Sequence, residues 1–205
     1  MADPINLPKT ESSCRPADSG WTGSGDFWVF GYGSLMWRPG FDYLESAQAL
    51  LRGYHREFCI YSQHHRGTHE KPGLVLGLDR GGCCRGVAYR VADDEVDSVI
   101  EYLIERELVT RAYVPKTVPI RIGDRRLDAY TFVVDRSHRQ YAGDLEIDAA
   151  AAIIMDAEGQ SGLNRDYLIN TVRQLEKMGF TDKRLHALLG RVEALTGEID
   201  RGSGI

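Results

Sequence analysis

Glu107 is the residue whose position most directly suggests chemistry. The pattern from Asp93 to Leu108 predicts a helix, because apolar residues recur there at helical spacing. Glu107 follows Leu103 by four positions and Ile100 by seven, so its carboxyl group falls on the apolar face. Desolvation there would raise its pKa, as a general acid/base working near neutral pH requires. Two plainer interpretations stay open: pairing with an arginine, or exposure at the helix end.

The second candidate is the glycine-rich segment after the apolar run 27–30, a run that predicts a strand buried on both sides. Gly31 and Gly33 flank Tyr32, and glycines permit positive φ angles and close approach of another molecule to the backbone. Consecutive N–H groups in such a loop can form an anion-binding nest, and Ser34 can cap a turn. A plain turn between two elements remains the alternative, because short glycine motifs are weak signals.

Three other possibilities involve polar side chains. Arg66, in a polar loop, could anchor a substrate carboxylate through its planar guanidinium or could simply be solvated. His64, His65 and His69 could hold a metal, but no carboxylate partner is evident. Ser34 lies outside any Gly-x-Ser-x-Gly motif and has no evident base, which argues against a serine hydrolase.

Composition narrows the function classes. The 205 residues, with 42% hydrophobic and 27% charged side chains, suit one globular domain with a proper core. A net charge of −5 without a basic block indicates neither nucleic-acid nor membrane binding. No apolar run reaches the roughly 18 residues of a membrane span, and no leader follows Met1, so we expect a cytoplasmic protein. The spacing of Cys14, Cys59, Cys83 and Cys84 predicts reduced thiols, at least one buried, rather than a metal site.

The elements that must position these residues predict an α+β fold. We expect a disordered or loosely packed extension over 1–26, one domain over 27–197, and a flexible tail over 198–205. Predicted strands cover 27–30, 49–61, 73–78, 86–91, 113–122 and 127–134, with a turn at 79–82. Predicted helices cover 93–108, a segment from 148, one capped by Asn164 and ending at Gly179, and one capped by Thr181 and ending at Gly197. Short strands with glycine turns favour a small, mostly antiparallel, barrel-like sheet with helices packed on it.

Several motifs occur together in a fixed order. They are Trp28–Trp37, His65–Thr68, Pro72-Gly73, Arg85–Arg90, Arg106-Glu107 and Ser161–Leu168. In this order the chain resembles the ChaC family, the glutathione-specific γ-glutamylcyclotransferases, over about residues 27–195. The resemblance implies a γ-glutamylcyclotransferase-like fold, a small barrel with flanking helices. It also implies cleavage of glutathione to 5-oxoproline and Cys-Gly without a metal or cofactor.

The resemblance further implies residue roles. Glu107 would be the catalytic acid/base, the Tyr-Gly-Ser-Leu loop would bind the γ-glutamyl group, and Tyr167 would line the pocket, where Arg66 is also a candidate from its own chemistry. The substrate-binding segment as a whole would comprise Val29, Phe30, Gly31, Tyr32, Gly33, Ser34 and Leu35. Leu74 stands where some relatives carry arginine, which leaves recognition of the glycyl end less determined.

Three alternatives remain beside this interpretation. The same cyclisation could act on other γ-glutamyl amino acids or amines, because the recognisable chemistry lies at the glutamyl end. The pocket could serve a non-catalytic regulatory binding protein, although such a protein gains nothing from a desolvated Glu107. A metal-dependent hydrolysis through the histidines is the third. We expect no nucleic-acid or membrane partner; the sequence does not set the oligomeric state, and a monomer is favoured.

Overall fold

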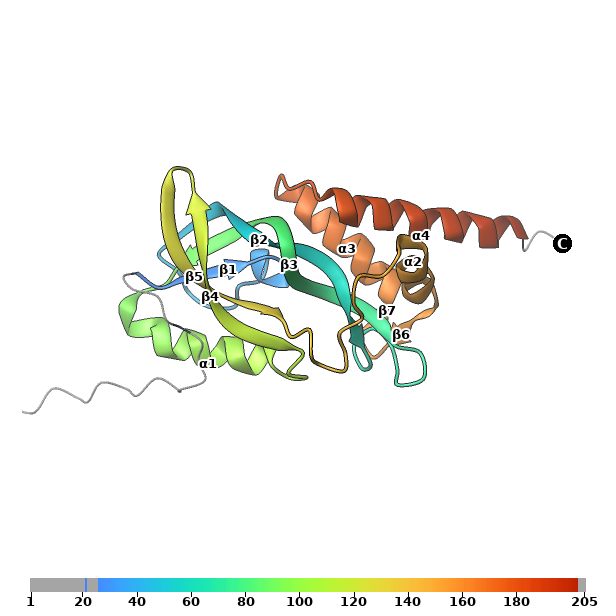
Figure 1. The fold of residues 1–205 in the computed structure, drawn as a ribbon, viewed down its shortest axis with the longest axis horizontal. Helices are drawn as coiled ribbons and strands as arrows, with labels where there is room; N and C mark the ends of the chain where they lie inside the picture. The colour runs from blue at the N-terminus through green and yellow to red at the C-terminus, as the bar shows by residue number, and fades with distance from the viewer. Residues whose placement is uncertain (1–20, 22–25, 203–205) are drawn as a thin grey trace, which may run out of the picture.

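The computed structural model describes Trp21 and residues 26–202. Most of the predicted N-terminal extension, including Cys14, and the last residues of the predicted C-terminal tail lie outside the described residues. The described chain is a mixed α+β structure in which five strands close a barrel and four α-helices flank it (Figure 1). The predicted fold class is therefore confirmed.

Strands make up most of the first two thirds of the described chain, and helices make up most of the last third. The strands are β1 (Trp28–Gly31), β2 (Glu45–Ser62), β3 (Gly73–Arg90), β4 (Tyr113–Ile122), β5 (Arg125–Val134), β6 (Glu158–Gly159) and β7 (Gly162–Leu163). The helices are α1 (Val96–Glu107), α2 (Ile147–Asp156), α3 (Asn164–Lys177) and α4 (Lys183–Gly202), with short 3₁₀ turns at Ser34–Met36 and Asp93–Glu95.

The barrel has the strand order β1-β3-β2-β4-β5. All neighbouring pairs are antiparallel except the closing pair, in which Val29 of β1 lies beside Tyr130 of β5 in parallel. Figure 1 shows α1 along one side of this barrel and α2, α3 and α4 gathered at its other end. Long β2 and β3 extend from the barrel toward that helical group.

The predicted turn at residues 79–82 is wrong. β3 continues through this segment and stays paired with β2 along its length. Gly81 and Gly82 do adopt positive φ angles, of 103° and 65°, but Gly53 opposite them also has a positive φ of 84°. The pairing shifts register there, between Arg52 and Tyr54. One residue of β2, Gly53, thus lies opposite two residues of β3, Gly81 and Gly82. This bulge accommodates the glycine conformations, and the ladder continues beyond it instead of reversing.

β1 is buried on both sides, as its apolar run predicted. Trp28 and Phe30 belong to the core between the barrel and α2–α4, whereas Val29 belongs to the core beneath α1. Helix α1 contributes Val96, Val99, Ile100 and Leu103 to that second core. Because β1 lies between two cores, the segment that leaves it is held rigidly at the end of α1.

Several predicted helix ends need correction. The predicted helix 93–108 is a 3₁₀ turn over Asp93–Glu95 followed by α1, and α1 has no side-chain cap. Asn164 begins α3, but its amide bonds the backbone N–H and C=O of Leu74, each at 2.7 Å, and so ties α3 to β3. At α4 the capping oxygen comes from Asp182, which accepts from the Leu185 N–H, rather than from Thr181. α4 also runs past the predicted end at Gly197, to Gly202, into the predicted tail.

Candidate active site

A small cavity at the end of α1 brings together residues from distant parts of the chain. Its volume is about 100 Å³. The wall consists of Tyr32, Gly33, Ser34, Leu35, Val75, Leu76, Glu107, Tyr113, Phe132 and Tyr167. The carboxyl group selected by helical periodicity and the glycine-rich loop therefore face one space.

Glu107 is the last residue of α1 and is partly withdrawn from solvent. Its side chain is 21% exposed, and Oε1 lies 3.3 Å from Nε of Arg106. Burial raises the pKa of Glu107 above its ordinary value, and the neighbouring Arg106 charge opposes part of that rise. Desolvation with a raised pKa and pairing with an arginine were alternative interpretations of the Glu107 position. In the structure both occur together. A carboxyl group with a raised pKa is a better proton acceptor than one of ordinary pKa.

Arg106 joins the end of α1 to the loop that follows β1. Its Nη2 donates to the Ser34 hydroxyl at 2.9 Å, and its Nη1 donates to the backbone oxygens of Arg38 and Pro39 at 2.7 and 3.2 Å. Nη1 also donates to the Tyr102 hydroxyl at 2.8 Å. Since these bonds occupy both terminal nitrogens, Arg106 fixes the distance between Glu107 and the loop.

The two loop glycines do not adopt positive φ angles, contrary to expectation. Gly33 precedes the 3₁₀ turn with φ −126°. The reason for glycine is close packing: a Cβ added at Gly31 would lie 3.0 Å from the Leu35 Cβ, and one at Gly33 would lie 3.3 Å from a Leu76 methyl group. The backbone of the loop therefore packs closely against its own turn and against β3.

Three tyrosines supply the polar wall of the cavity. The Tyr113 hydroxyl donates to the Leu76 carbonyl at 2.8 Å. Burial raises the pKa values of Tyr32, Tyr113 and Tyr167, and the nearby Glu107 carboxylate adds to each rise. The phenols consequently stay protonated at neutral pH, and Glu107 contributes the carboxyl group of the cavity wall.

A wider cleft of about 520 Å³ adjoins the cavity and shares Val75, Glu107 and Tyr113 with it. His64, His65 and His69 line this cleft. His65 Nδ1 lies 3.2 Å from the Ser161 hydroxyl. Among the described residues, no group of three or more His, Cys, Asp or Glu side chains is placed to hold a metal ion. The three histidines therefore contribute polar groups to the lining of the wider cleft.

Arg66 and Tyr167 contact each other, but only Tyr167 lines the cavity. The Arg66 guanidinium lies over the Tyr167 ring, 5.2 Å from its centroid. Its Nη1 donates to the Ser161 and Leu163 carbonyls at 2.5 and 3.4 Å. These contacts commit Arg66 to holding the β6–β7 turn and the Tyr167 ring in place.

Part of the predicted binding segment lies in the core instead of the cavity wall. Val29 and Phe30 have no exposed surface, and Gly31 is the last residue of β1. The wall begins at Tyr32. Leu74 is also fully buried, so it does not reach the cleft. Cys59 and Cys84 are buried free thiols and Cys83 is an exposed one, so the prediction of at least one buried thiol is confirmed.

Sequence reasoning missed the part of the wall that comes from β3, β4 and β5: Val75, Leu76, Tyr113 and Phe132. All four lie in ordinary strand patterns. Only the three-dimensional arrangement of the barrel strands places them at the cavity. Tyr113 carried a usable signal, because a tyrosine at a strand start can bury its ring and keep its hydroxyl bonded. Arg56, a buried cation in β2, was also missed.

Comparison with known proteins identifies the family. Residues 27–195 match the family described as ChaC-like protein. The chain belongs to the ChaC family. A ChaC relative named glutathione-specific γ-glutamylcyclotransferase, from Escherichia coli, is 36% identical over 187 residues, covering 91% of this chain and 78% of that protein. Glutathione-specific γ-glutamylcyclotransferase 1 from Homo sapiens is 36% identical over 197 residues, covering 91% and 89%.

The ChaC fold is also seen in a solved structure. A crystal structure of the γ-glutamyl cyclotransferase specific to glutathione from yeast superposes with a TM-score of 0.74, at 24% identity. The match covers 83% of this chain and 99% of that one. It supports the assignment of a γ-glutamylcyclotransferase-like barrel with flanking helices. Within the described part of this ChaC chain, no helix combines the length and the apolar character of a membrane span.

Proposed function

We propose that this protein is a γ-glutamylcyclotransferase that converts glutathione to 5-oxoproline and Cys-Gly. The observation that carries the proposal is the shared cavity of Glu107 and the loop Tyr32–Leu35. A desolvated carboxyl group opposite a compact backbone loop is suited to proton transfer on a small polar substrate. Relatives from bacteria and mammals that are named for this activity on glutathione support the choice of substrate.

The reaction closes a five-membered lactam within the γ-glutamyl group. The substrate's α-amino nitrogen attacks its own γ-carbonyl carbon, and the bond from that carbon to the cysteinyl nitrogen then breaks. Nucleophile and electrophile belong to one molecule, so the protein's main task is to hold the reactive rotamer. Such orientation can lower a barrier by up to about 7–11 kcal/mol. A narrow cavity with rigid walls is well suited to that task.

Glu107 would move the proton that the reaction requires. The α-amine enters as an ammonium ion and must lose a proton before it attacks, and the ionised Glu107 carboxylate would accept it. The departing cysteinyl nitrogen must gain a proton, and protonated Glu107 would return it. The attacking nitrogen is positively charged once it has bonded and loses a second proton, and the released Cys-Gly amine takes up one proton to become an ammonium ion. The raised pKa serves both steps, since a carboxyl group of ordinary pKa is a poor base near neutrality.

Backbone donors at the start of the 3₁₀ turn would bind the negative oxygens of the substrate. The first backbone bond of this turn runs from the Met36 N–H to the Gly33 carbonyl. The N–H groups of Ser34 and Leu35 precede this bond, so the turn itself does not use them. Groups of this kind can hold the substrate carboxylate or the oxyanion that forms at the γ-carbonyl.

The size of the two hollows fits a tripeptide that is held mainly by its glutamyl end. Ligand pockets commonly measure ~300–1,000 Å³. The inner cavity, at about 100 Å³, suits the γ-glutamyl group, and the adjoining cleft of about 520 Å³ would take the Cys-Gly part. Because the cleft is wide, action on other γ-glutamyl compounds remains the second candidate.

A product assay tests the proposal. Purified protein is incubated with glutathione in the presence of a chelator, and 5-oxoproline, Cys-Gly and free glutamate are quantified. We expect equal amounts of 5-oxoproline and Cys-Gly and no glutamate. Free glutamate in place of 5-oxoproline would indicate hydrolysis and overturn the mechanism. A panel of γ-glutamyl amino acids, assayed in parallel, measures the preference for the tripeptide.

We also propose that the protein acts in the cytoplasm as a monomer. The proposal rests on the sequence, which has no apolar run long enough for a membrane span and no long basic block. Cell fractionation and size-exclusion chromatography with light scattering test the two parts. A dimer mass in solution would refute the second part.

A further inference from the structure

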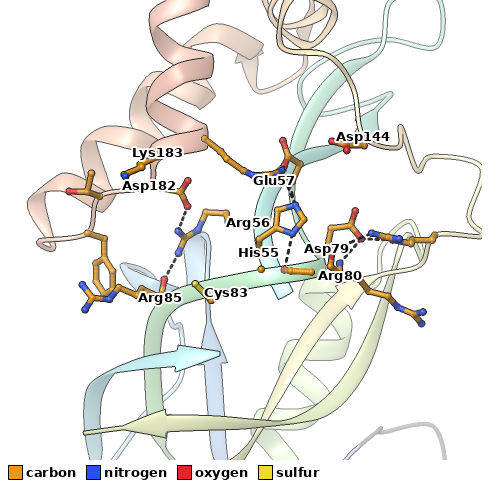
Figure 2. Close-up of a pocket in the computed structure, with 16 residues that line it drawn as sticks. His55, Arg56, Glu57, Asp79, Arg80, Cys83, Arg85, Asp144, Asp182 and Lys183 are labelled. Carbon is orange, nitrogen blue, oxygen red and sulfur yellow. Dashed lines mark hydrogen bonds and ion pairs between the residues drawn. The ribbon is translucent and has the colours of Figure 1, made fainter. Parts of the chain in front are cut away.

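Arg56 is a buried cation that contacts the backbone of the loop Tyr32–Leu35. It projects from β2 and is only 3% exposed. Its Nε donates to the Tyr32 carbonyl at 2.5 Å, and its Nη2 donates to the Arg85 carbonyl at 2.7 Å and lies 3.6 Å from the Met36 sulfur. Its Nη1 pairs with Asp182 at 2.9 Å (Figure 2). Removing a guanidinium group from water costs free energy, and hydrogen bonds and ion pairs such as these must compensate for that cost.

The bond from Arg56 fixes the orientation of one peptide unit of the loop. The Tyr32 carbonyl and the Gly33 N–H belong to the same peptide, and no peptide is cis among the described residues. In a trans peptide these two groups point in opposite directions. Arg56 lines the cleft drawn in Figure 2, whereas Tyr32 and Gly33 line the catalytic cavity. With its oxygen held toward Arg56, the peptide directs the Gly33 N–H to the opposite side, toward the cavity.

Arg56 also changes the electrostatics of that peptide. A charged donor on the carbonyl polarises the amide and strengthens its N–H as a donor. The guanidinium is almost completely buried, so solvent screens its charge poorly and it favours negative charge nearby. Asp182, with a side chain 18% exposed, faces the opposite end of the guanidinium from the loop contact. The charge on Arg56 is thus held in one position between the loop and Asp182, which lies in the connection between α3 and α4.

We propose that Arg56 is a positioning residue for the cyclisation, an inference that rests on the proposed function. It orients the Tyr32–Gly33 peptide so that the Gly33 N–H donates to a negative oxygen of the substrate. Asp182, in the connection between α3 and α4, holds Arg56 in that orientation. The C-terminal helices, which contribute Tyr167 directly to the cavity wall, would also act on catalysis through this ion pair.

Chemical rescue distinguishes this role from ordinary structural support. Arg56→Ala is assayed with and without low, non-denaturing concentrations of guanidinium ion, which can enter from the cleft in Figure 2. Removing an oxyanion donor lowers kcat by about 10²–10³, and a donor that is only misoriented should give a loss of about 10–100-fold in kcat/KM. Added guanidinium should restore a large part of that loss. A change confined to kcat would place the Gly33 N–H at the γ-carbonyl, and a change in KM would place it at the substrate carboxylate.

Arg136→Ala is the matched control. Arg136 forms an ion pair with Asp79 in the same cleft, at 2.7 Å, and its guanidinium donates to Asp79 and to the Arg80 carbonyl, away from the loop. We expect this variant to keep wild-type kcat/KM and to show no response to guanidinium. Asp182→Asn, which keeps an oxygen to accept from the Leu185 N–H, is the milder companion if Arg56→Ala does not fold. Its expected loss in kcat/KM is smaller than that of Arg56→Ala.

Two results would overturn the inference. One is wild-type kcat/KM in folded Arg56→Ala or, if only the companion folds, in Asp182→Asn. The other is a loss that guanidinium does not restore and that merely follows a fall in melting temperature. If the wild-type protein makes no 5-oxoproline, the proposed function fails instead. The Gly33 amide resonance then still tests the geometry: it should shift in Asp182→Asn and stay in place in Arg136→Ala.

Discussion

Glu107 and Asp79 are two shielded carboxyl groups in different hollows, and they titrate in opposite directions. Asp79 lines the cleft of Figure 2 with a side chain only 6% exposed, and Glu107 lines the candidate active-site cavity with a side chain 21% exposed. Burial raises the pKa of both. The pKa of Glu107 ends above its ordinary value, whereas that of Asp79 ends below it. The group with the less exposed side chain is therefore the stronger acid.

The difference lies in the partners of each group. Asp79 accepts from Arg136 Nε at 2.7 Å, from the Tyr141 hydroxyl at 2.8 Å and from the Arg80 N–H at 2.7 Å. These donors favour the ionised form and outweigh the effect of burial on its pKa. Glu107 has the Arg106 contact at 3.3 Å, and Arg106 uses its terminal nitrogens elsewhere. Three donors thus satisfy the carboxyl group of Asp79, whereas the weaker partnering of Glu107 suits the proton exchange that we propose for it.

The largest expected effect is the loss of turnover in Glu107→Gln. An amide cannot accept the ammonium proton, so kcat for 5-oxoproline formation should fall by about 10²–10⁴-fold. The melting temperature should stay the same or rise, because the variant removes a carboxyl group that is ionised at a desolvation cost. Normal turnover by the folded variant would remove Glu107 from the proposed role and break the comparison.

Asp79→Asn should show the reverse pattern. The variant keeps the shape of the side chain but loses its charge, so the charge-assisted bond from Arg136 is weakened in a buried setting. We expect a loss of about 1–3 kcal/mol in the free energy of unfolding, measured by urea denaturation. Because Asp79 does not line the catalytic cavity, kcat/KM should remain at the wild-type value. A fall in kcat/KM without loss of stability would contradict the assignment.

The pH dependence separates the two groups within the wild-type protein. For Glu107 the folded pKa is raised, so its contribution to stability is fully present below its ordinary pKa of 4.5 and is lost as pH rises through the folded pKa. For Asp79 the folded pKa is lowered, so its contribution is present above its ordinary pKa of 3.8 and is lost as pH falls through the folded pKa. Unfolding free energies of wild type and each variant across pH give the two curves. The ratio kcat/KM should rise with pH as Glu107 ionises, with a midpoint above 4.5.

The smallest expected effect is that of Tyr141→Phe. This variant removes one donor from Asp79 and leaves the bonds from Arg136 and Arg80 in place. The expected cost is about 1 kcal/mol of unfolding free energy, and the acid limb of the stability curve should move to higher pH, because the pKa of Asp79 then falls less. An unchanged acid limb would show that the Tyr141 bond contributes nothing to the low pKa.

Much of the candidate site could be predicted from local pattern. The periodicity of α1 selected Glu107, because a carboxyl group on an apolar helix face is anomalous at the level of three or four neighbouring residues. The glycines on either side of Tyr32 marked the loop for the same reason. The conformation assigned to those glycines was wrong, because what excludes a side chain there is contact with Leu35 and Leu76, and Leu76 lies far along the chain.

Local sequence patterns were enough to predict the fold class, the buried β1 strand, the polarity of α1 and the residues that we propose carry the chemistry. The tertiary structure decided which of them meet. Closure of the barrel placed Tyr113 and Phe132 beside the loop, and docking of the C-terminal helices supplied Tyr167 and Asp182. It also decided the two pKa shifts, because burial and hydrogen-bond partners come from chain segments that no local pattern relates. The local sequence shows which ionisable group is present, and packing with its hydrogen-bond partners decides the pKa of that group.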